Sequence, residues 1–504
     1  MASGAGPEES PALRAGAEAM VRGDLREALR IFDAAVLTER GDYALCALVD
    51  AACVTDQLGE HAEAVARFRE ALARMPDHAP RMRPVALINL SQALQHLGDL
   101  DGAQDAMERA RAELAAPDAP VDLRFAGLVS ATALALHRQQ WSRAIELANE
   151  SLSAAEHYAP AQAGHPLMNL AAAHFETGRW ELAEDFAGQA LAAFSAAGDS
   201  SGVAETTQNL AIMHSRSGRF DEAERLLLAA QKYFDETGVA YRAGIGWKIM
   251  GFIAEQRTDL NLAETRYRQA LAHFEESGAV IDATDVRTRS AMVAFAAHRY
   301  ADGERALADA RATYAGHGLG LHCAQLDHWH AGLLEPLLEA DPALLHRAVD
   351  LAVPAALALD AVRYELPDGP QRETWSRRIA DPALRVAFRY AYLAGDAHLI
   401  ADLIETSCVG TTLDIGRIAA TPAQAPHLNL LEPMAAPPPP TAAIADALHL
   451  GSALAAVAAG AGLPVAPPPY VAVAPDGHLA LAAWIAAAEQ RYGRRLRDER
   501  VVRS

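Results

Sequence analysis

The densest cluster of potential metal ligands lies in the run LHCAQLDHWH, residues 321–330. If this run is helical, Cys323, Asp327 and His330 fall on one stripe and could offer sulfur, oxygen and nitrogen to one ion. A structural zinc site needs four ligands, however, and no second Cys/His pair lies nearby in the sequence. We therefore interpret the run as a helix with ordinary polar and buried residues, and we predict no metal and no cofactor.

Two further patterns resemble catalytic or nucleotide-binding motifs. Residues 198–202 (GDSSG) have the spelling of a nucleophile elbow, which requires a strand before it and a helix after it. Here the run follows the helical segment ALAAFSAA, so it reads as an ordinary turn. A P-loop requires Gly-Lys-Ser/Thr, and neither Lys232 nor Lys248, the two lysines of the chain, stands in that context. The sequence therefore predicts no catalytic residue in these motifs.

The composition excludes several classes of protein. The chain has 504 residues and a formal charge of −21, from 65 acidic and 44 basic residues, which disfavours binding to nucleic acid. Four cysteines in so long a chain are too few for a disulfide framework. The first residues, MASGAGPEESP, lack the features of a secretory signal, and the uncharged stretch 447–474 is interrupted by prolines. We expect a cytoplasmic protein that does not enter a membrane.

An internal repeat determines the predicted fold. A turn signal such as Gly-Asp-Leu is followed at a fixed offset by a small residue and then by a large apolar one. The small residues are Ala28, Ala64, Ala103, Ala144, Ala183, Ala223, Ala263 and Gly303. Their spacing is 36 to 41 residues, and apolar residues recur at helical spacing on both sides of each turn. Each unit therefore reads as two helices joined by a tight turn, in which the small residue lets the backbones approach closely.

These residues resemble the tetratricopeptide repeat (TPR) family, whose usual period is about 34 residues. The resemblance covers about 300 residues and implies an all-α superhelical solenoid of about eight helix pairs with a long concave surface. Beyond Gly316 the period stops, and residues 319–339, 342–362 and 371–408 read as capping helices. Further on we expect a Pro-rich linker, an Ala-rich helix over about 441–462, a hairpin over 470–481 and a short helix through Tyr492. The expected divisions are a disordered 1–10, a TPR array 11–315, a helical cap 316–415, the linker 416–440 and a C-terminal segment 441–504.

Two segments are similar to non-catalytic parts of actinobacterial proteins that join TPRs to a caspase-like CHAT protease. They are RYELPDGPQRETW (363–375) and the tail PYVAVAPDGHLALAAWIAAAEQRYG. The family's dyad is a His and a Cys, each following a strand, and the residues that look similar are His317 and Cys408. Both follow apparent helices, so we interpret them as a cap histidine and a small buried thiol. The protease part is expected to be absent.

In TPRs the first helix of each pair lines the concave face. Asn89, Asn169 and Asn209 share one phase of the repeat, and the resemblance implies that they form a peptide-binding ladder, since family members that bind peptides use asparagine there. An amide can pair with a peptide backbone through both its donor and its acceptor. The alternative is that these amides satisfy backbone groups of neighbouring repeats.

A small basic spot is predicted beside this ladder. Gln208 and Lys248 lie one step earlier in the phase, and Arg289 occupies the asparagine position of a later repeat. Together they could hold a carboxylate of a partner peptide. The alternative is isolated charges on a solvated face.

The leading hypothesis is a non-enzymatic bacterial adaptor whose groove binds a protein or peptide. Its expected setting is signalling or defence, with a CHAT-type protease as the partner it regulates. One alternative is a cysteine protease that uses His317 and Cys408. Another is a TPR regulator whose groove is closed by its own Pro-rich C-terminal segment. The sequence does not indicate the oligomeric state.

Overall fold

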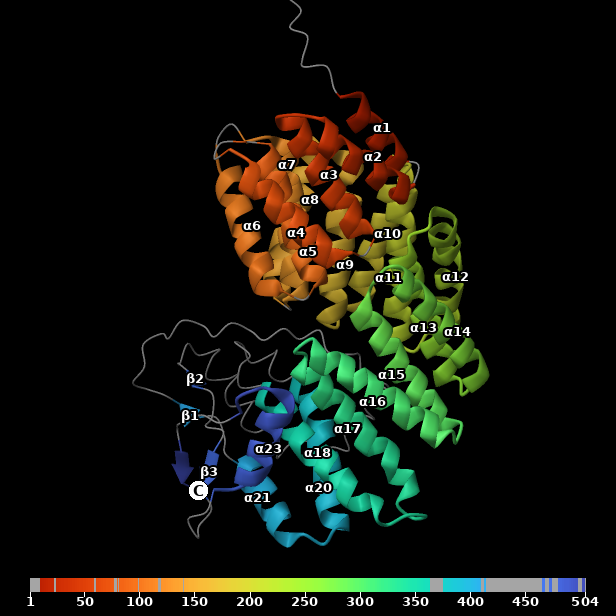
Figure 1. Ribbon diagram of the computed structural model, residues 1–504, viewed down its shortest axis with the longest axis vertical. Coiled ribbons are helices and arrows are strands. Elements are labelled where there is room, and N and C mark those ends of the chain that lie inside the picture. The colour runs from red at the N-terminus through yellow and green to blue at the C-terminus, as the bar shows by residue number, and fades with distance from the viewer. Residues whose placement is uncertain are drawn as a thin grey trace, which may run out of the picture. The chain divides into compact units, whose positions relative to one another are not determined.

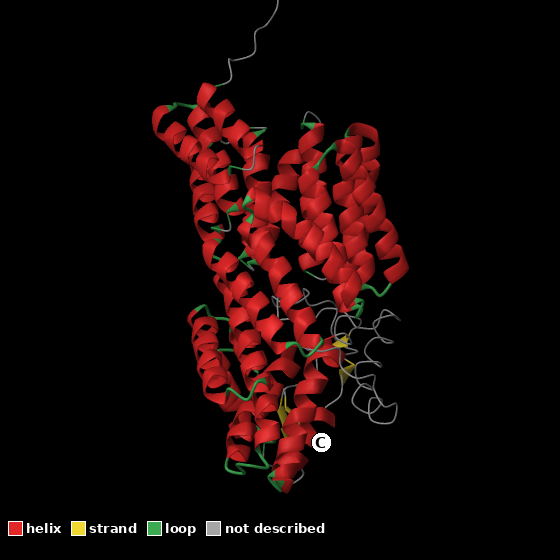
Figure 2. Cartoon of the chain, turned by 90° about the vertical axis from the view of Figure 1, so that its right-hand side faces the viewer, coloured by secondary structure: helices red, strands yellow, loops and turns green. Residues whose placement is uncertain are grey.

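The computed structural model describes most of the chain as helix (Figure 2). The described residues are 10–21, 24–58, 60–76, 79, 81–97, 99–116, 119–138, 140–362, 375–408, 412–413, 465–466, 471–473, 479–496 and 501–503. Within them the helices pack in consecutive pairs, which confirms the predicted all-α, TPR-like solenoid. The disorder expected for the first residues, the linker at 416–440 and the helix at 441–462 lie outside the described residues.

The chain divides into two compact units, residues 1–286 (unit 1) and residues 287–504 (unit 2), and the division falls inside α15 (Val280–Ala296). Unit 1 consists of helix pairs (Figure 1). The pairs are α1 (Pro11–Val21) with α2 (Leu25–Thr38), α3 (Asp42–Gln57) with α4 (His61–Arg74), α5 (Met82–His96) with α6 (Leu100–Leu114), α7 (Val121–His137) with α8 (Trp141–Tyr158), α9 (Gly164–Glu176) with α10 (Trp180–Ala197), α11 (Ser200–Arg216) with α12 (Phe220–Thr237), and α13 (Ala240–Gln256) with α14 (Leu260–Glu276). A short 3₁₀ turn, η1 (Pro160–Gln162), precedes α9.

The repeat residues occupy the positions that the sequence predicts. The small residues at the helix crossings, from Ala28 to Ala263, are fully buried. The large residues that follow them fill the space behind, with Phe32, Phe68 and Tyr267 at most 1% exposed. The turn aspartates act as N-caps: Asp99 accepts a hydrogen bond from the Gly102 N–H at 2.9 Å, which satisfies one of the free donors of α6.

The odd-numbered helices of unit 1 form an inner layer. Each contacts its own pair partner and also the next odd-numbered helix, from α1 against α3 to α11 against α13. A helix in this layer is therefore covered on several sides, which explains why α5 and α7 bury apolar residues around most of their circumference. The even-numbered helices are amphipathic and cover the outside. Any concave surface must consequently come from the polar residues of the odd-numbered helices.

Unit 2 continues with helices that are less regular in length. They are α16 (Tyr300–Gly316), α17 (Gly320–Leu334), the 3₁₀ turn η2 (Glu335–Leu337), α18 (Leu344–Ala361), the π-helical turn η4 (Ser376–Ala380), α20 (Asp381–Leu393), α21 (Ala397–Cys408) and α23 (Ala482–Tyr492). Helix α18 is the centre of this unit, because it contacts α17, α20 and α23. The short helix predicted to end at Tyr492 is confirmed as α23.

The predicted C-terminal hairpin is wrong. Its first arm coincides with β3 (Val471–Val473), but the partner of β3 among the described residues is β4 (Val501–Arg503), which lies parallel to it. The Pro-Asp-Gly run indicates only a local turn, and a more distant segment supplies the strand partner. The second sheet is also minimal, with β1 (Thr412–Leu413) antiparallel to β2 (Val465–Ala466).

None of the described helices contains an apolar stretch long enough to span a membrane.

Candidate binding groove

Unit 1 contains a cavity of about 980 Å³ between its inner helices. One wall comes from the C-terminal turns of α3, α5 and α7, and the opposite wall from the N-terminal turns of α11 and α13 with the end of α12. The first wall presents Asp56, Gln57, Gln92, Gln95, His96, Ala133 and His137. The second presents Gly198, Asp199, Ser200, Ser201, Glu205, Tyr241 and Arg242. We call this cavity the groove.

The superhelix curves enough to bring distant repeats together beside the groove. His61, the first residue of α4, lies edge-on to the ring of Tyr241 on α13, with 6.0 Å between the ring centroids. Burial raises the pKa of Tyr241 to about 12, helped by the nearby carboxylate of Asp282, so its hydroxyl stays protonated. The groove is therefore bounded on one side by a contact between the second and seventh helix pairs.

Three ionisable residues of the groove, Arg242, Glu205 and His137, add no net charge to its walls. Arg242 pairs with Glu205 at 2.9 Å, across α13 and α11. Burial lowers the pKa of His137 to about 4, and the neighbouring His96 acts in the same direction, so His137 is neutral at pH 7. Together with the glutamine amides, these groups give a polar surface that can form hydrogen bonds without strong selection by charge.

A ladder of ionisable residues follows the last turns of the inner helices, and sequence reasoning missed it. Asp56 lies one residue before the end of α3, and His96 and His137 are the last residues of α5 and α7. Glu176 and Arg216 are the last residues of α9 and α11. The Arg216 guanidinium pairs with the Glu176 carboxylate. The signal was present in the sequence, because His96, Glu176 and Arg216 each stand seven residues after a ladder asparagine.

The predicted asparagines lie on inner helices but outside the set of residues that line the groove. Asn89 donates to the sulfur of Cys53 at 3.3 Å, and Asn209 donates to the sulfur of Met168 at 3.3 Å. Both acceptors are side-chain sulfurs of the preceding inner helix and not the backbone groups that the alternative names. Asn169 is 8% exposed. A role of these amides in peptide binding stays a prediction.

The three residues of the predicted basic spot are held by structural contacts or buried. Gln208 is fully buried and donates to the carbonyl oxygen of Arg242 at 2.8 Å, which joins α11 to α13. Lys248 lies 3.2 Å from Asp285 and 3.7 Å from Asp282, both on α15. The positive charge of Lys248 is thus compensated. Arg289 is 4% exposed in unit 2.

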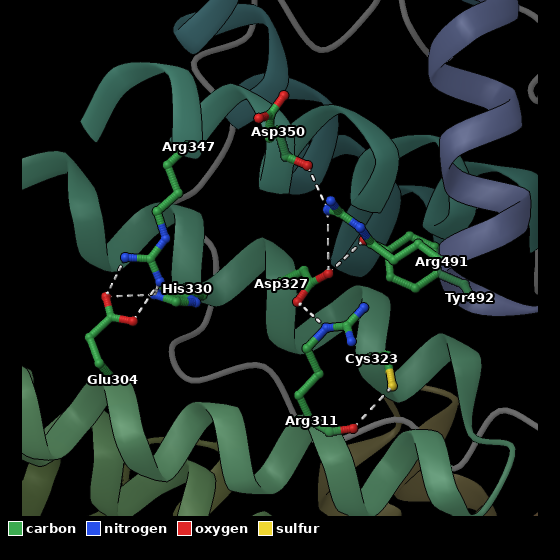
Figure 3. A network of polar contacts seen from close by, with 9 residues as sticks. All are labelled: Glu304, Arg311, Cys323, Asp327, His330, Arg347, Asp350, Arg491 and Tyr492. Atoms are coloured by element: carbon green, nitrogen blue, oxygen red, sulfur yellow. Dashed lines mark hydrogen bonds and ion pairs between the residues drawn. The ribbon is translucent and has the colours of Figure 1, made fainter. Parts of the chain in front are cut away.

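The candidate metal ligands of unit 2 do not converge on one point (Figure 3). Asp327 accepts hydrogen bonds from Arg311 at 3.0 Å and from the Tyr492 hydroxyl at 2.9 Å. His330 instead faces Glu304, with 3.0 Å between Nε2 and the carboxylate, and the thiol of Cys323 points to the carbonyl of Arg311. The helix predicted for this run is confirmed as α17.

The two residues of the protease alternative lie at helix ends. His317 caps the C-terminus of α16, and its Nδ1 lies 2.8 Å from the carbonyl oxygen of Thr313. Cys408 is the last residue of α21. The run 198–202 is likewise a turn: Gly198 ends α10 in the left-handed region, and Asp199 caps α11 by accepting from the Gly202 N–H.

Comparisons with known proteins agree with this architecture. A family model described as tetratricopeptide repeat matches residues 163–236, which span α9 to α12. No curated protein matches the sequence. The crystal structure of a Rap protein complexed with Competence and Sporulation Factor is similar, with 14% identity and a TM-score of 0.50, over 68% of this chain and 96% of that chain. The apo form of the quorum sensor NprR from B. thuringiensis aligns with 13% identity and a TM-score of 0.40, over 70% of this chain and 98% of that chain.

Proposed function

We propose that this tetratricopeptide repeat protein is a non-enzymatic adaptor that binds a peptide, or an extended segment of a partner protein, in the groove of unit 1. The observation that carries the proposal is a cavity of about 980 Å³ lined mainly by the inner helices of a TPR solenoid. Its volume is at the upper end of the roughly 300–1,000 Å³ typical of ligand sites. The Rap protein of similar fold, solved in complex with Competence and Sporulation Factor, supports the choice of a peptide or protein guest.

The chemistry of the walls suits a peptide backbone. An extended peptide offers one N–H and one C=O at each residue, and the amides of Gln57 and Gln92 can act as both donor and acceptor. The rings of His61 and Tyr241 add flat, partly apolar surfaces against which a side chain can pack. Because Glu205 and Arg242 neutralise each other, we expect selection by shape and hydrogen bonding more than by net charge.

A blocking substitution tests the site. Ala133→Arg places a long side chain in the groove from α7, whereas Ala192→Arg adds the same side chain to the exposed face of α10. Both variants and the unchanged protein would be screened against a displayed library of random peptides. We expect sequence-selective enrichment with the unchanged protein and with Ala192→Arg, and its loss with Ala133→Arg. Enrichment that survives Ala133→Arg would place binding elsewhere, and no enrichment with any of the three would reject peptide binding.

The asparagine ladder is tested in the same screen. The double variant Asn169→Ala, Asn209→Ala is expected to reduce enrichment while thermal unfolding stays nearly unchanged. A lower midpoint of unfolding with full retention of binding would instead assign the amides to contacts between repeats, such as that of Asn209 with Met168.

The narrower proposal names a caspase-like CHAT protease as the partner. Its support is the sequence resemblance of residues 363–375 and of the C-terminal tail. The expected outcome is co-purification of this protein with a CHAT protease encoded beside it in the same genome, and that interaction should be lost with Ala133→Arg.

A further inference from the structure

Two histidines and one aspartate from three helices meet at the edge of the groove. The Nδ1 atom of His61 lies 2.7 Å from Oδ1 of Asp56, and the Nδ1 atom of His96 lies 3.2 Å from the same oxygen. The two imidazole rings are tilted by 44° to each other, with 4.4 Å between their centroids. Asp56 is near the end of α3, His61 begins α4 and His96 ends α5, and these helices contact one another (Figure 1).

The types and positions of these atoms fit a transition metal ion. Two imidazole nitrogens and a carboxylate oxygen form a common ligand set for zinc and for metals of similar preference. The three ligand atoms lie within 4.8 Å of one another. Metal–ligand bonds of about 2.0–2.1 Å in tetrahedral geometry require separations of about 3.4 Å, so adjustments of about an ångström complete the site.

The side chains of the cluster carry the donor atoms that such an ion requires. An imidazole that holds its proton on Nε2 offers the lone pair of Nδ1, and the Asp56 carboxylate offers an oxygen. Binding of the ion would replace the hydrogen bonds between the two Nδ1 atoms and Asp56 by bonds to the ion, and the protons of those hydrogen bonds would pass to the solvent.

The position of the cluster leaves room for a further ligand. All three residues line the groove, and the side chains of His61, Asp56 and His96 are 11%, 14% and 39% exposed. Three protein ligands with access to solvent leave the fourth position of a tetrahedral ion open, as in sites that bind water or an external ligand. We propose that Asp56, His61 and His96 bind one divalent transition metal ion whose open coordination position faces the groove.

The proposed metal site is not the one suggested by the spacing of residues in the sequence. There the spacing within one helix suggested Cys323, Asp327 and His330, which the structure directs to separate partners. Here the ligands come from adjacent repeats. Among the described residues, this is the cluster in which such ligands meet. The proposal does not depend on peptide binding, because the ion alone is the test ligand.

The experiment uses the untagged full-length protein, stripped with a chelator and titrated with Co²⁺ while the visible absorption of the bound ion is recorded. Zn²⁺ then competes for the site. We expect saturation at one ion per chain. The double variant His61→Gln, His96→Gln should weaken binding by more than the roughly 10–100-fold that follows loss of a mere outer-shell partner.

Two further variants guard against misinterpretation. Asp56→Asn keeps the shape of the side chain and an acceptor oxygen but removes the anion, so it should weaken binding while circular dichroism confirms the fold. His157→Gln removes an exposed histidine of α8 and should change nothing. Absence of saturable binding at one equivalent, or unchanged affinity in both the double variant and Asp56→Asn, would overturn the proposal and leave the cluster as a hydrogen-bonded contact between repeats.

Discussion

Two buried or partly buried aspartates show how strongly the surroundings of a carboxylate determine its effect on stability. Asp327 is 1% exposed, but Arg311, Arg491 and Tyr492 surround it, so its negative charge is compensated (Figure 3). Asp50, on α3, shows the opposite situation, because burial raises its pKa from 3.8 to about 6. Asp327 is thus held by three partners in the folded protein, whereas ionised Asp50 opposes folding.

The Asp50→Asn variant should be more stable than the unchanged protein at pH 7.5. The folded-state pKa of Asp50 is raised above its unfolded value, so its favourable contribution is present below about pH 4 and is lost as the pH rises through about 6. Asparagine does not ionise, so the Asp50→Asn variant does not lose stability as the pH rises. At about 1.4 kcal/mol per pKa unit, discounted for partial exposure, we expect a gain of roughly 1–2 kcal/mol.

Urea unfolding at pH 7.5 and at pH 4 measures this difference. The gain should disappear at pH 4, where Asp50 is protonated in the folded state. The control is Asp105→Asn on α6, whose side chain is 71% exposed and which should show no such pH dependence. Equal effects of Asp50→Asn at the two pH values would contradict the interpretation.

At the residue scale, the sequence predicted the buried residues of the repeats better than the residues that line the groove. Positions such as Ala223 and Tyr267 could be assigned because each is defined by its own repeat and the next. The Asp56 cluster could not, because His61 lies outside the phase shared by Asp56 and His96, and because the curvature that places Tyr241 beside His61 is a sum over several repeats.

The turns within the helix pairs have a common backbone geometry at 40-residue intervals. Gly178 and Gly218 adopt φ of 77°, in the left-handed region that suits glycine. Thr258 and His298 occupy the same place in the next two repeats with φ of 59° and 60°. A side chain with a Cβ atom is strained there, and a β-branched one more so. These two turns are therefore less favourable than the turns that contain glycine.

Exchanging the turn residues should change stability in opposite directions. Thr258→Gly relieves the left-handed strain but raises the entropy of the unfolded chain, so we expect a net gain of roughly 0.5 kcal/mol. Gly218→Ala introduces the strain and should cost about 1 kcal/mol or more. The midpoint of thermal unfolding measures both. A loss of stability in Thr258→Gly would show that the hydrogen bond from the Thr258 hydroxyl to the Arg257 carbonyl outweighs the strain.

At the element scale, sequence patterns that recur in every repeat predicted the helices correctly, whereas a single turn motif predicted a strand pairing that is wrong. Helix pairs were predicted because the same spacing of small and large residues recurs, and each recurrence supports the others. The hairpin at 470–481 rested on one Pro-Asp-Gly turn. Strand pairing depends on which segments meet in three dimensions, and β3 meets β4 at Val501–Arg503.

At the scale of a whole unit, the last described helix ties the end of the chain back to α17. Tyr492 of α23 donates to Asp327 at 2.9 Å, and Arg491 donates to the carbonyl oxygen of Asp350 on α18 at 2.6 Å. Tyr492 is 4% exposed, and burial raises the pKa of its hydroxyl above the usual range, so the hydroxyl stays a donor. Unit 2 is therefore completed by residues from the far end of the sequence.

The Tyr492→Phe variant should loosen this attachment. Loss of a hydrogen bond to a charged group typically costs about 1.5–3 kcal/mol, and Arg311 and Arg491 remain to limit the effect. Hydrogen exchange of peptides from α17 and α23, followed by mass spectrometry, should show faster exchange in unit 2. Tyr392→Phe on α20, where the side chain is 74% exposed, serves as the control. Unchanged exchange in Tyr492→Phe would mean that packing alone holds α23.

The contact between His61 and Tyr241 affects the order in which the repeats of unit 1 unfold. In an open row of repeats, the terminal ones can fray first, because each touches only its neighbours. Here the second and seventh pairs also contact each other, so the repeats between them form a closed ring of contacts. Opening any one junction leaves the others held from both sides. The middle of unit 1 should thus melt as a block, with the outermost pair α1 and α2 free to fray ahead of it.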